Sequence, residues 1–166
     1  RHYACFFLVY AKYCVLSAFQ LNIDGLHLYE NIEFTGENMA LIPFDDRDGF
    51  IWFDGKMIPW REAHVHVICH GLHYGSAVFE GERAYEGKIF KSKEHTSRLF
   101  KSANILGMDI PFTEDEINAA KEETLKVNNL VDAYIRPVAW RGSEHMGIAA
   151  QATKTHVAIA CWEWPS

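Results

Sequence analysis

The chain has 166 residues, 49% hydrophobic and 23% charged, a balance typical of a globular protein with its own core. A net charge of -6 and scattered Lys and Arg residues argue against a general nucleic-acid binder, which would carry a basic patch. The four cysteines have unrelated spacings and no CxxC motif, which argues against a disulfide framework or a zinc ribbon and favours reduced thiols in a cytoplasmic protein: Cys5, Cys14, Cys69 and Cys161.

Residues 1–38 show no clean hydrophobic period, whereas regular strands, turns and capped helices are indicated from Met39 onward. We interpret Met39 as the initiator and residues 1–38 as a non-native or poorly structured extension. The codons of Gly36 and Glu37 can spell a ribosome-binding sequence, which supports this; a natural extension is the alternative. The apolar stretch from Cys5 to Leu21 is interrupted by Lys12 and fits neither a membrane span nor a secretory signal.

The first predicted element after the extension is a hairpin over residues 50–60, because Asp54-Gly55 is a pair that a type I′ turn prefers. Further strands are predicted over residues 65–68 and 77–90, the second folding back at Glu86-Gly87.

Two helices follow the hairpins in the predicted order of elements. The first covers residues 93–106 and stops at Gly107, and the second opens at the capping box Thr113–Glu116 and runs to about Asn128. Alternating patterns predict the last strands over residues 132–141 and 155–162. We therefore expect an α+β domain with an antiparallel sheet and two helices.

Two predicted strands carry residues that suit a binding site. The period of two places Phe79, Gly81, Arg83 and Tyr85 on one face, and a glycine inside a strand marks a bulge, a packing need or the close approach of a ligand. Tyr134 and Arg136 share a face of another strand. An arginine among apolar residues needs a partner, which is either a structural acid or the carboxylate of a ligand.

Arg98 is a weaker signal for a binding site. It lies near the predicted start of the 93–106 helix, where an arginine suits a phosphate group, although many surface helices carry such a residue without a ligand. Four histidines resemble a metal site, but no acidic or cysteine ligand accompanies them at suitable spacing, so core or turn roles are expected for His64, His66, His70 and His73.

Five segments in fixed order carry a family resemblance: IWFDGK (51–56), HGLHYGSAVFEGERAY (70–85), EHTSRLFKSANILG (94–107), AYIRPVAWRG (133–142) and GIAAQATKTHVAIACWEW (147–164). With them, residues 39–166 closely resemble bacterial branched-chain amino-acid aminotransferases, which are fold-type IV pyridoxal-phosphate enzymes. The resemblance implies a D-amino-acid aminotransferase-like fold, of which this chain is the N-terminal small domain without the second domain.

The resemblance also implies roles for single residues. Arg98 corresponds to the arginine that holds the phosphate of pyridoxal 5'-phosphate. Phe79 and Gly81 correspond to the wall and floor of the substrate pocket, and Tyr134 and Arg136 to the pair that meets substrate carboxylates. Tyr74 and Ile148 correspond to positions that complete this pocket, typically from the neighbouring subunit, so a homo-oligomer (dimer or hexamer) is implied.

The implied reaction transfers the amino group of leucine, isoleucine or valine to 2-oxoglutarate. In the family, the lysine that forms the Schiff base lies downstream, and no lysine of this chain matches its motif, so the chain alone is expected to be inactive. A D-amino-acid aminotransferase, an aminodeoxychorismate lyase, and a non-catalytic binding module are the alternatives.

Overall fold

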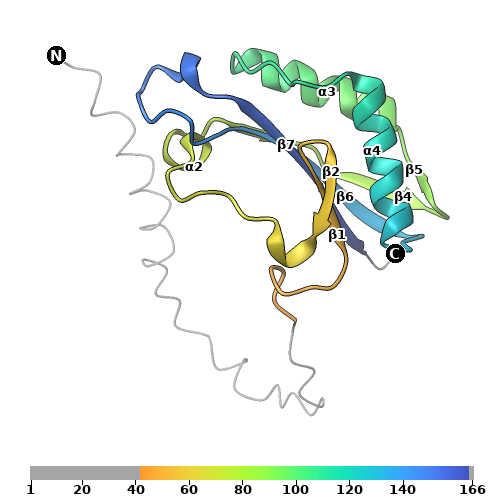
Figure 1. The fold of residues 1–166 in the computed structure, drawn as a ribbon. Coiled ribbons are helices and arrows are strands. Elements are labelled where there is room, and N and C mark those ends of the chain that lie inside the picture. The colour runs from red at the N-terminus through yellow and green to blue at the C-terminus, as the bar shows by residue number, and fades with distance from the viewer. Residues whose placement is uncertain (1–41, 165–166) are drawn as a thin grey trace, which may run out of the picture. The chain divides into compact units, whose positions relative to one another are not determined.

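The computed structural model describes residues 42–164, and every structural statement below concerns this part of the chain (Figure 1). The expectations for Met39 and for the stretch 5–21 lie outside the described residues. The elements in chain order are β1 (Phe50–Phe53), β2 (Lys56–Pro59), η1 (Trp60–Glu62), α2 (His70–Tyr74), β3 (Ala77–Phe79), β4 (Glu82–Tyr85), β5 (Lys88–Ile89), α3 (Ser92–Ile105), α4 (Glu114–Val127), β6 (Ala133–Arg141), η2 (Ala150–Ala152) and β7 (Thr155–Glu163).

The strands form one antiparallel sheet in the order β2-β1-β7-β6-β4-β5, with β3 also paired to β6. The long strands β6 and β7 lie at its centre and pair along their whole length, from Ala133 opposite Glu163 to Arg141 opposite Thr155. Figure 1 shows α3 and α4 together on one side of this sheet. The expected α+β domain with an antiparallel sheet and two helices is confirmed.

The main core lies between the sheet and these two helices. Side chains alternate along β6 and β7, so Ile135, Ala139, Val157 and Ile159 point toward the helices and are fully buried together with Ile117 of α4. Burying a large aliphatic side chain stabilises a fold by about 1.5–3 kcal/mol. The alternate residues of β6, including Tyr134 and Arg136, therefore point to the opposite face of the sheet.

Local sequence signals set the ends of several elements. Asp54 and Gly55 both have positive φ (46° and 90°), as a type I′ turn requires, and the hairpin predicted over residues 50–60 is confirmed. The capping box at the start of α4 is also confirmed, because the Thr113 side chain accepts a hydrogen bond from the Glu116 backbone and the Glu116 carboxylate accepts one from the Thr113 backbone. Among residues 42–164, no helix is long and apolar enough to cross a membrane.

The strand predicted over residues 65–68 is wrong. These residues lie in a loop and a turn, in which the Cys69 N–H donates to the His66 carbonyl (2.9 Å) and the Ile68 N–H to the His66 ring (3.1 Å). The short helix α2, which ends at Gly75 in the left-handed conformation, was not predicted either. Its single turn is too short to show a helical period.

The strand segments β3 and β4 are separated at Glu80-Gly81, although both pair with β6 in one continuous register. The cause is Pro137 of β6. It lies opposite this point and has no N–H, so its carbonyl still accepts from Glu80 (3.0 Å) but the return hydrogen bond is missing. The predicted alternation of side chains along residues 79–85 therefore survives the interruption.

Candidate functional site

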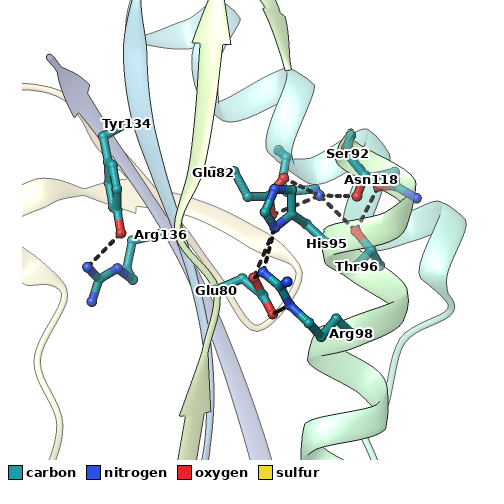
Figure 2. Close-up of polar contacts among 10 residues, drawn as sticks. Glu80, Glu82, Ser92, His95, Thr96, Arg98, Asn118, Tyr134 and Arg136 are labelled. Atoms are coloured by element: carbon teal, nitrogen blue, oxygen red, sulfur yellow. Dashed lines mark hydrogen bonds and ion pairs between the residues drawn. The ribbon is translucent and has the colours of Figure 1, made fainter. Parts of the chain in front are cut away.

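Four of the residues that sequence analysis assigned to the substrate pocket lie together on the sheet face that α3 and α4 leave open. The Arg136 guanidinium lies over the Phe79 ring, 4.2 Å from its centroid. It also donates a hydrogen bond to the Tyr134 hydroxyl (2.8 Å), which Figure 2 shows. Gly81 lies at the same point, because an added Cβ would overlap that hydroxyl. The strand register brings these residues together from β6 and from the β3–β4 segment.

Arg136 has no acidic partner among residues 42–164. None of the ion pairs in this part of the chain includes it, and its Nε atom is buried without an acceptor. Its contacts are the aromatic rings of Phe79 and Tyr134, at 4.2 and 5.1 Å, and one phenol oxygen. The structural acid that would explain an arginine at this position is therefore missing, and the guanidinium keeps hydrogen-bond donors for an anion.

Gly81 has a packing explanation within the domain. The Tyr134 side chain fills the space that any larger residue at position 81 would need. A glycine here thus allows the Tyr134 hydroxyl to approach the strand and to accept the hydrogen bond from Arg136.

An apolar hollow of about 350 Å³ adjoins Arg136 on the same face. Its lining is almost entirely aliphatic and aromatic, with contributions from β1, α2, β6 and β7, among them Phe53, Leu72, Val138 and Trp140. Arg136 is the one charged residue among those that line it. The face consequently offers an apolar surface and a cation side by side.

Arg98, the residue expected to hold the cofactor phosphate, lies elsewhere. It belongs to the middle of α3 rather than near its N-terminus as expected, so the argument from the helix end does not apply. Glu80, which points toward the helices, accepts two hydrogen bonds from the Arg98 guanidinium at 2.6 Å each and one from His95 (2.9 Å). Figure 2 shows this cluster across the strands from Tyr134 and Arg136.

Glu80, His95 and Arg98 form one cluster in which the charge of the Glu80 carboxylate is fixed by its partners. The hydrogen bonds from Arg98, together with those from His95, lower the pKa of the buried Glu80 carboxyl despite its desolvation. The carboxylate is therefore ionised and fixes the guanidinium plane, while 63% of the Arg98 side chain remains exposed. Sequence analysis did not identify Glu80 and His95 as site residues. The available signal was the pair Glu80 and Glu82, two acidic residues that alternate on the strand face toward the helices and therefore need basic partners.

Glu82 is that second glutamate, and its carboxylate is paired with Lys121 at 2.8 Å, both side chains being fully buried. The Lys121 ammonium also donates to the Thr96 hydroxyl and the Ser92 carbonyl. Desolvation raises the pKa of Glu82 and lowers that of Lys121, and their mutual hydrogen bonds oppose both shifts. Lys121 is the only buried lysine among residues 42–164, and this pairing gives it a structural role.

Tyr74 and Ile148 belong to two regions that contact each other, the helix α2 and the loop between β6 and β7. The Tyr74 hydroxyl donates to the Met146 carbonyl (3.3 Å), so α2 contacts the loop that carries Ile148. Both side chains are exposed, Ile148 by 86% and Tyr74 by 47%. The structure therefore brings these two regions together, and Leu72 of α2 lines the apolar hollow beside Arg136.

Of the four histidines considered as metal ligands, His66, His70 and His73 have side-chain hydrogen bonds of another kind. His70 shares a hydrogen bond with the Ser76 hydroxyl (2.6 Å), and His73 with the Val67 carbonyl (2.9 Å). Within residues 42–164 no group of three histidine, cysteine or acidic side chains is arranged to hold a metal ion.

Comparison with known proteins places this geometry in a family. The family model of amino-transferase class IV matches residues 77–166. The branched-chain-amino-acid aminotransferase of Pseudomonas aeruginosa is 52% identical over 123 residues, covering 72% of this chain and 40% of that protein. The Escherichia coli protein of the same name is 41% identical over 120 residues, covering 69% and 39%.

Solved structures agree with the sequence comparison. The crystal structure of the T.th. branched-chain amino acid aminotransferase, complexed with N-(5'-phosphopyridoxyl)-L-glutamate, matches with a TM-score of 0.68 and 41% identity, covering 71% of this chain and 42% of that one. The chain spans about 40% of the length of the curated relatives it matches. The resemblance and the fold type expected from sequence are confirmed, and the chain belongs to the amino-transferase class IV family.

Proposed function

We propose that this chain is the N-terminal part of an enzyme that transfers the amino group of leucine, isoleucine or valine to 2-oxoglutarate with the help of pyridoxal 5'-phosphate. The observation that carries the proposal is Arg136, a half-buried cation without an acidic partner among residues 42–164. An arginine in such surroundings is costly unless a ligand supplies the missing negative charge.

The two substrates of this reaction make opposite demands on one pocket. A branched aliphatic side chain needs apolar walls, whereas the side chain of glutamate ends in a carboxylate. Phe79 and the adjoining apolar hollow provide the walls, and Arg136 beside them provides a cation for the distal carboxylate. Tyr134 orients Arg136 through its hydroxyl and offers the same oxygen to the substrate. Gly81 leaves room for this hydroxyl.

Arg98 is proposed to hold the phosphate of the cofactor. Glu80 accepts hydrogen bonds from its Nε and one terminal nitrogen, and within residues 42–164 the other terminal nitrogen of this largely exposed side chain has no acceptor. A guanidinium that is oriented by a carboxylate through two of its nitrogens and keeps N–H donors on the third can bind a phosphate group. When bound, pyridoxal phosphate supplies the electron sink for the reaction. We assign no lysine of residues 42–164 to the Schiff base with the cofactor. Lys121 is paired with Glu82, and the other lysines of this part of the chain are exposed at the surface.

We further propose that Tyr74 and Ile148 complete the pocket of a neighbouring subunit in a cytoplasmic homo-oligomer. The support is the exposure of both side chains in this domain, which leaves them available to a second subunit. Residues 39–166 would form the N-terminal domain of this enzyme and residues 1–38 an extension outside it.

The test is a transamination assay on the full-length protein that carries this chain, loaded with pyridoxal 5'-phosphate. We expect formation of glutamate from 2-oxoglutarate with leucine, isoleucine and valine as donors. D-Alanine and aminodeoxychorismate serve as the comparison substrates. Preferential turnover of either one would contradict the proposal and favour the corresponding alternative, a D-amino-acid aminotransferase or an aminodeoxychorismate lyase. No turnover of any substrate would favour the non-catalytic module.

A further inference from the structure

A histidine outside the substrate pocket is held between two carboxylates. His156 of β7 contacts Asp54 of the β1–β2 turn through Nδ1 (2.5 Å) and Glu144 through Nε2 (2.8 Å). Glu144 belongs to the β6–β7 loop, which comprises residues 142–154 and carries Ile148. The imidazole thus connects this loop to the sheet.

The two carboxylate partners of His156 determine its protonation state. An ionised carboxylate only accepts hydrogen bonds, so an imidazole between two of them satisfies both only when both of its nitrogens are protonated. Burial lowers the pKa of His156, but the hydrogen bonds that it donates to Asp54 and Glu144 raise it, and the net shift is upward. The cluster is therefore a cation between two anions.

Each carboxylate has a second partner that holds it in place. The other oxygen of Asp54 accepts from the Val157 N–H (2.8 Å), and the other oxygen of Glu144 accepts from the Lys154 N–H (3.0 Å). The Trp140 ring stacks on His156 at 5.7 Å between centroids. Gly142 is required beside them, because an added Cβ would overlap both His156 and Glu144.

The residues that follow Glu144 in this loop include Met146, which contacts Tyr74, and Ile148. Met146, two residues after Glu144, accepts the hydrogen bond from the Tyr74 hydroxyl, and Ile148 follows two residues later. Arg141 anchors the other end of the loop through the Ala150 carbonyl (3.0 Å). Within the described part of the chain, the hydrogen bond from Tyr74 is the only one that joins a side chain to residues 145–149, so the position of Ile148 depends on these anchors.

We propose that His156, as an imidazolium bound to Asp54 and Glu144, is a positioning residue that sets the β6–β7 loop and with it Tyr74 and Ile148. The pocket part of this inference rests on the proposed function, in which those two residues contact substrate. Above the pKa of His156 the neutral ring donates to one carboxylate only, and the hold on the loop weakens. Asp54, Glu144 and His156 line a second hollow of about 210 Å³, and the other titratable side chains that line it are His64, His66 and Cys69.

The experiment uses the full-length protein, with Glu144→Gln and Glu144→Ala as test variants. Glu123→Gln is the matched control, because Glu123 is an exposed residue of α4 that lies outside both sites. Hydrogen–deuterium exchange of peptides covering residues 143–150, corrected for intrinsic rates, reports on the loop without reference to activity. At about pH 6, below the ordinary pKa of histidine, we expect both test variants to lose roughly tenfold or more of the protection, as for one charge-assisted hydrogen bond.

This difference between wild type and Glu144→Gln is expected to shrink as the pH rises through the pKa of His156, while Glu123→Gln follows wild type throughout. Equal protection in wild type and both Glu144 variants at about pH 6 would overturn the proposed hold on the loop.

Kinetics test the pocket part separately. In an active enzyme, Glu144→Gln is expected to raise KM for leucine several-fold with a smaller change in kcat, because the loop shapes the pocket and not the reacting atoms. An unchanged KM beside a loosened loop would overturn the positioning role. An inactive wild-type enzyme would instead contradict the proposed function, and the exchange result would still decide whether His156 holds the loop.

Discussion

Two arginines of this domain, Arg136 and Arg98, differ in what surrounds them. Arg98 pairs with the buried Glu80 through two hydrogen bonds, so its charge is balanced within the domain. Arg136 has aromatic rings and a phenol around it and no carboxylate among residues 42–164. Arg98 therefore has a carboxylate partner in this part of the chain, whereas Arg136 has none there. The free guanidinium of Arg136 indicates where the carboxylate of a ligand would bind.

Gly81 and Tyr134 form a pair that mutations can separate. Gly81→Ala places a methyl group where the Tyr134 hydroxyl lies, so we expect a loss of stability of about 1–3 kcal/mol, as for other overpacked sites. In the double variant with Tyr134→Phe, the overlapping oxygen is absent and the loss is expected to be smaller than the sum of the two single effects. Urea unfolding of the four proteins measures this; additive effects would show that the two residues do not compete for space.

Arg98 is expected to affect cofactor affinity more than substrate choice. In the full-length protein, Arg98→Ala removes a charge-assisted contact to the phosphate and is expected to weaken binding of pyridoxal 5'-phosphate roughly tenfold or more. Lys101→Ala, on the same helix and also exposed, is the control. Titration of the apoprotein with the cofactor gives the affinity, and an unchanged value for Arg98→Ala would show that the phosphate lies elsewhere.

At the scale of elements, a buried ion pair connects α4 to the sheet. Lys121 and Glu82 are both fully buried, and Lys121 reaches two further oxygens of α3, so three elements meet at one ammonium group. Such a pair contributes little compared with an apolar replacement, but either partner left alone is a buried charge without compensation.

Lys121→Met is therefore expected to destabilise the domain by about 3–5 kcal/mol, because Glu82 then stays buried without its partner. The double variant Glu82→Met/Lys121→Met is expected to recover much of this loss. Chemical unfolding of wild type, both single variants and the double variant checks the prediction. A double variant that is less stable than Lys121→Met would contradict it.

The sequence predicted correctly those elements whose ends are set by residues close together in the chain. The Asp54-Gly55 turn and the Thr113–Glu116 capping box are set by a few neighbouring residues, and both are present. The strand predicted over residues 65–68 failed because its apolar residues find no neighbouring strand, a property of the tertiary fold. The pairing of Arg98 with Glu80, 18 residues away, likewise depends on how α3 packs on the sheet.

At the scale of the whole molecule, the site residues form two groups that differ in their contacts. Phe79, Gly81, Tyr134 and Arg136 contact one another on the open face of the sheet, whereas Tyr74 and Ile148 are exposed and contact none of these four through a hydrogen bond within residues 42–164. Exposed side chains of this kind are available to a second subunit, as expected if each pocket combines the first group of one subunit with the second group of another.

Mixing two inactive variants tests the shared pocket. Full-length Tyr74→Ala and Arg136→Met subunits are each expected to be impaired, whereas hybrid oligomers contain some pockets with both residues intact. In a two-fold symmetric dimer, equal mixing restores roughly a quarter of the pockets. Recovery of activity after co-refolding supports pockets built from two subunits, and no recovery in demonstrably mixed oligomers would show that Tyr74 and Arg136 act in the same subunit.

The central claim is that Arg136 recognises the distal carboxylate of glutamate, and Arg136→Met in the full-length protein tests it most directly. A site built to bind a charged group discriminates sharply between substrates that carry it and those that do not, and Met keeps the length and apolar character of the side chain. The measurement is kcat/KM for leucine and for glutamate, together with a thermal melt. We expect a loss of about a hundredfold for glutamate and 2-oxoglutarate, a much smaller loss for leucine, and a Tm close to that of wild type. Equal losses for leucine and glutamate with a large drop in Tm would contradict the claim and assign Arg136 a structural role.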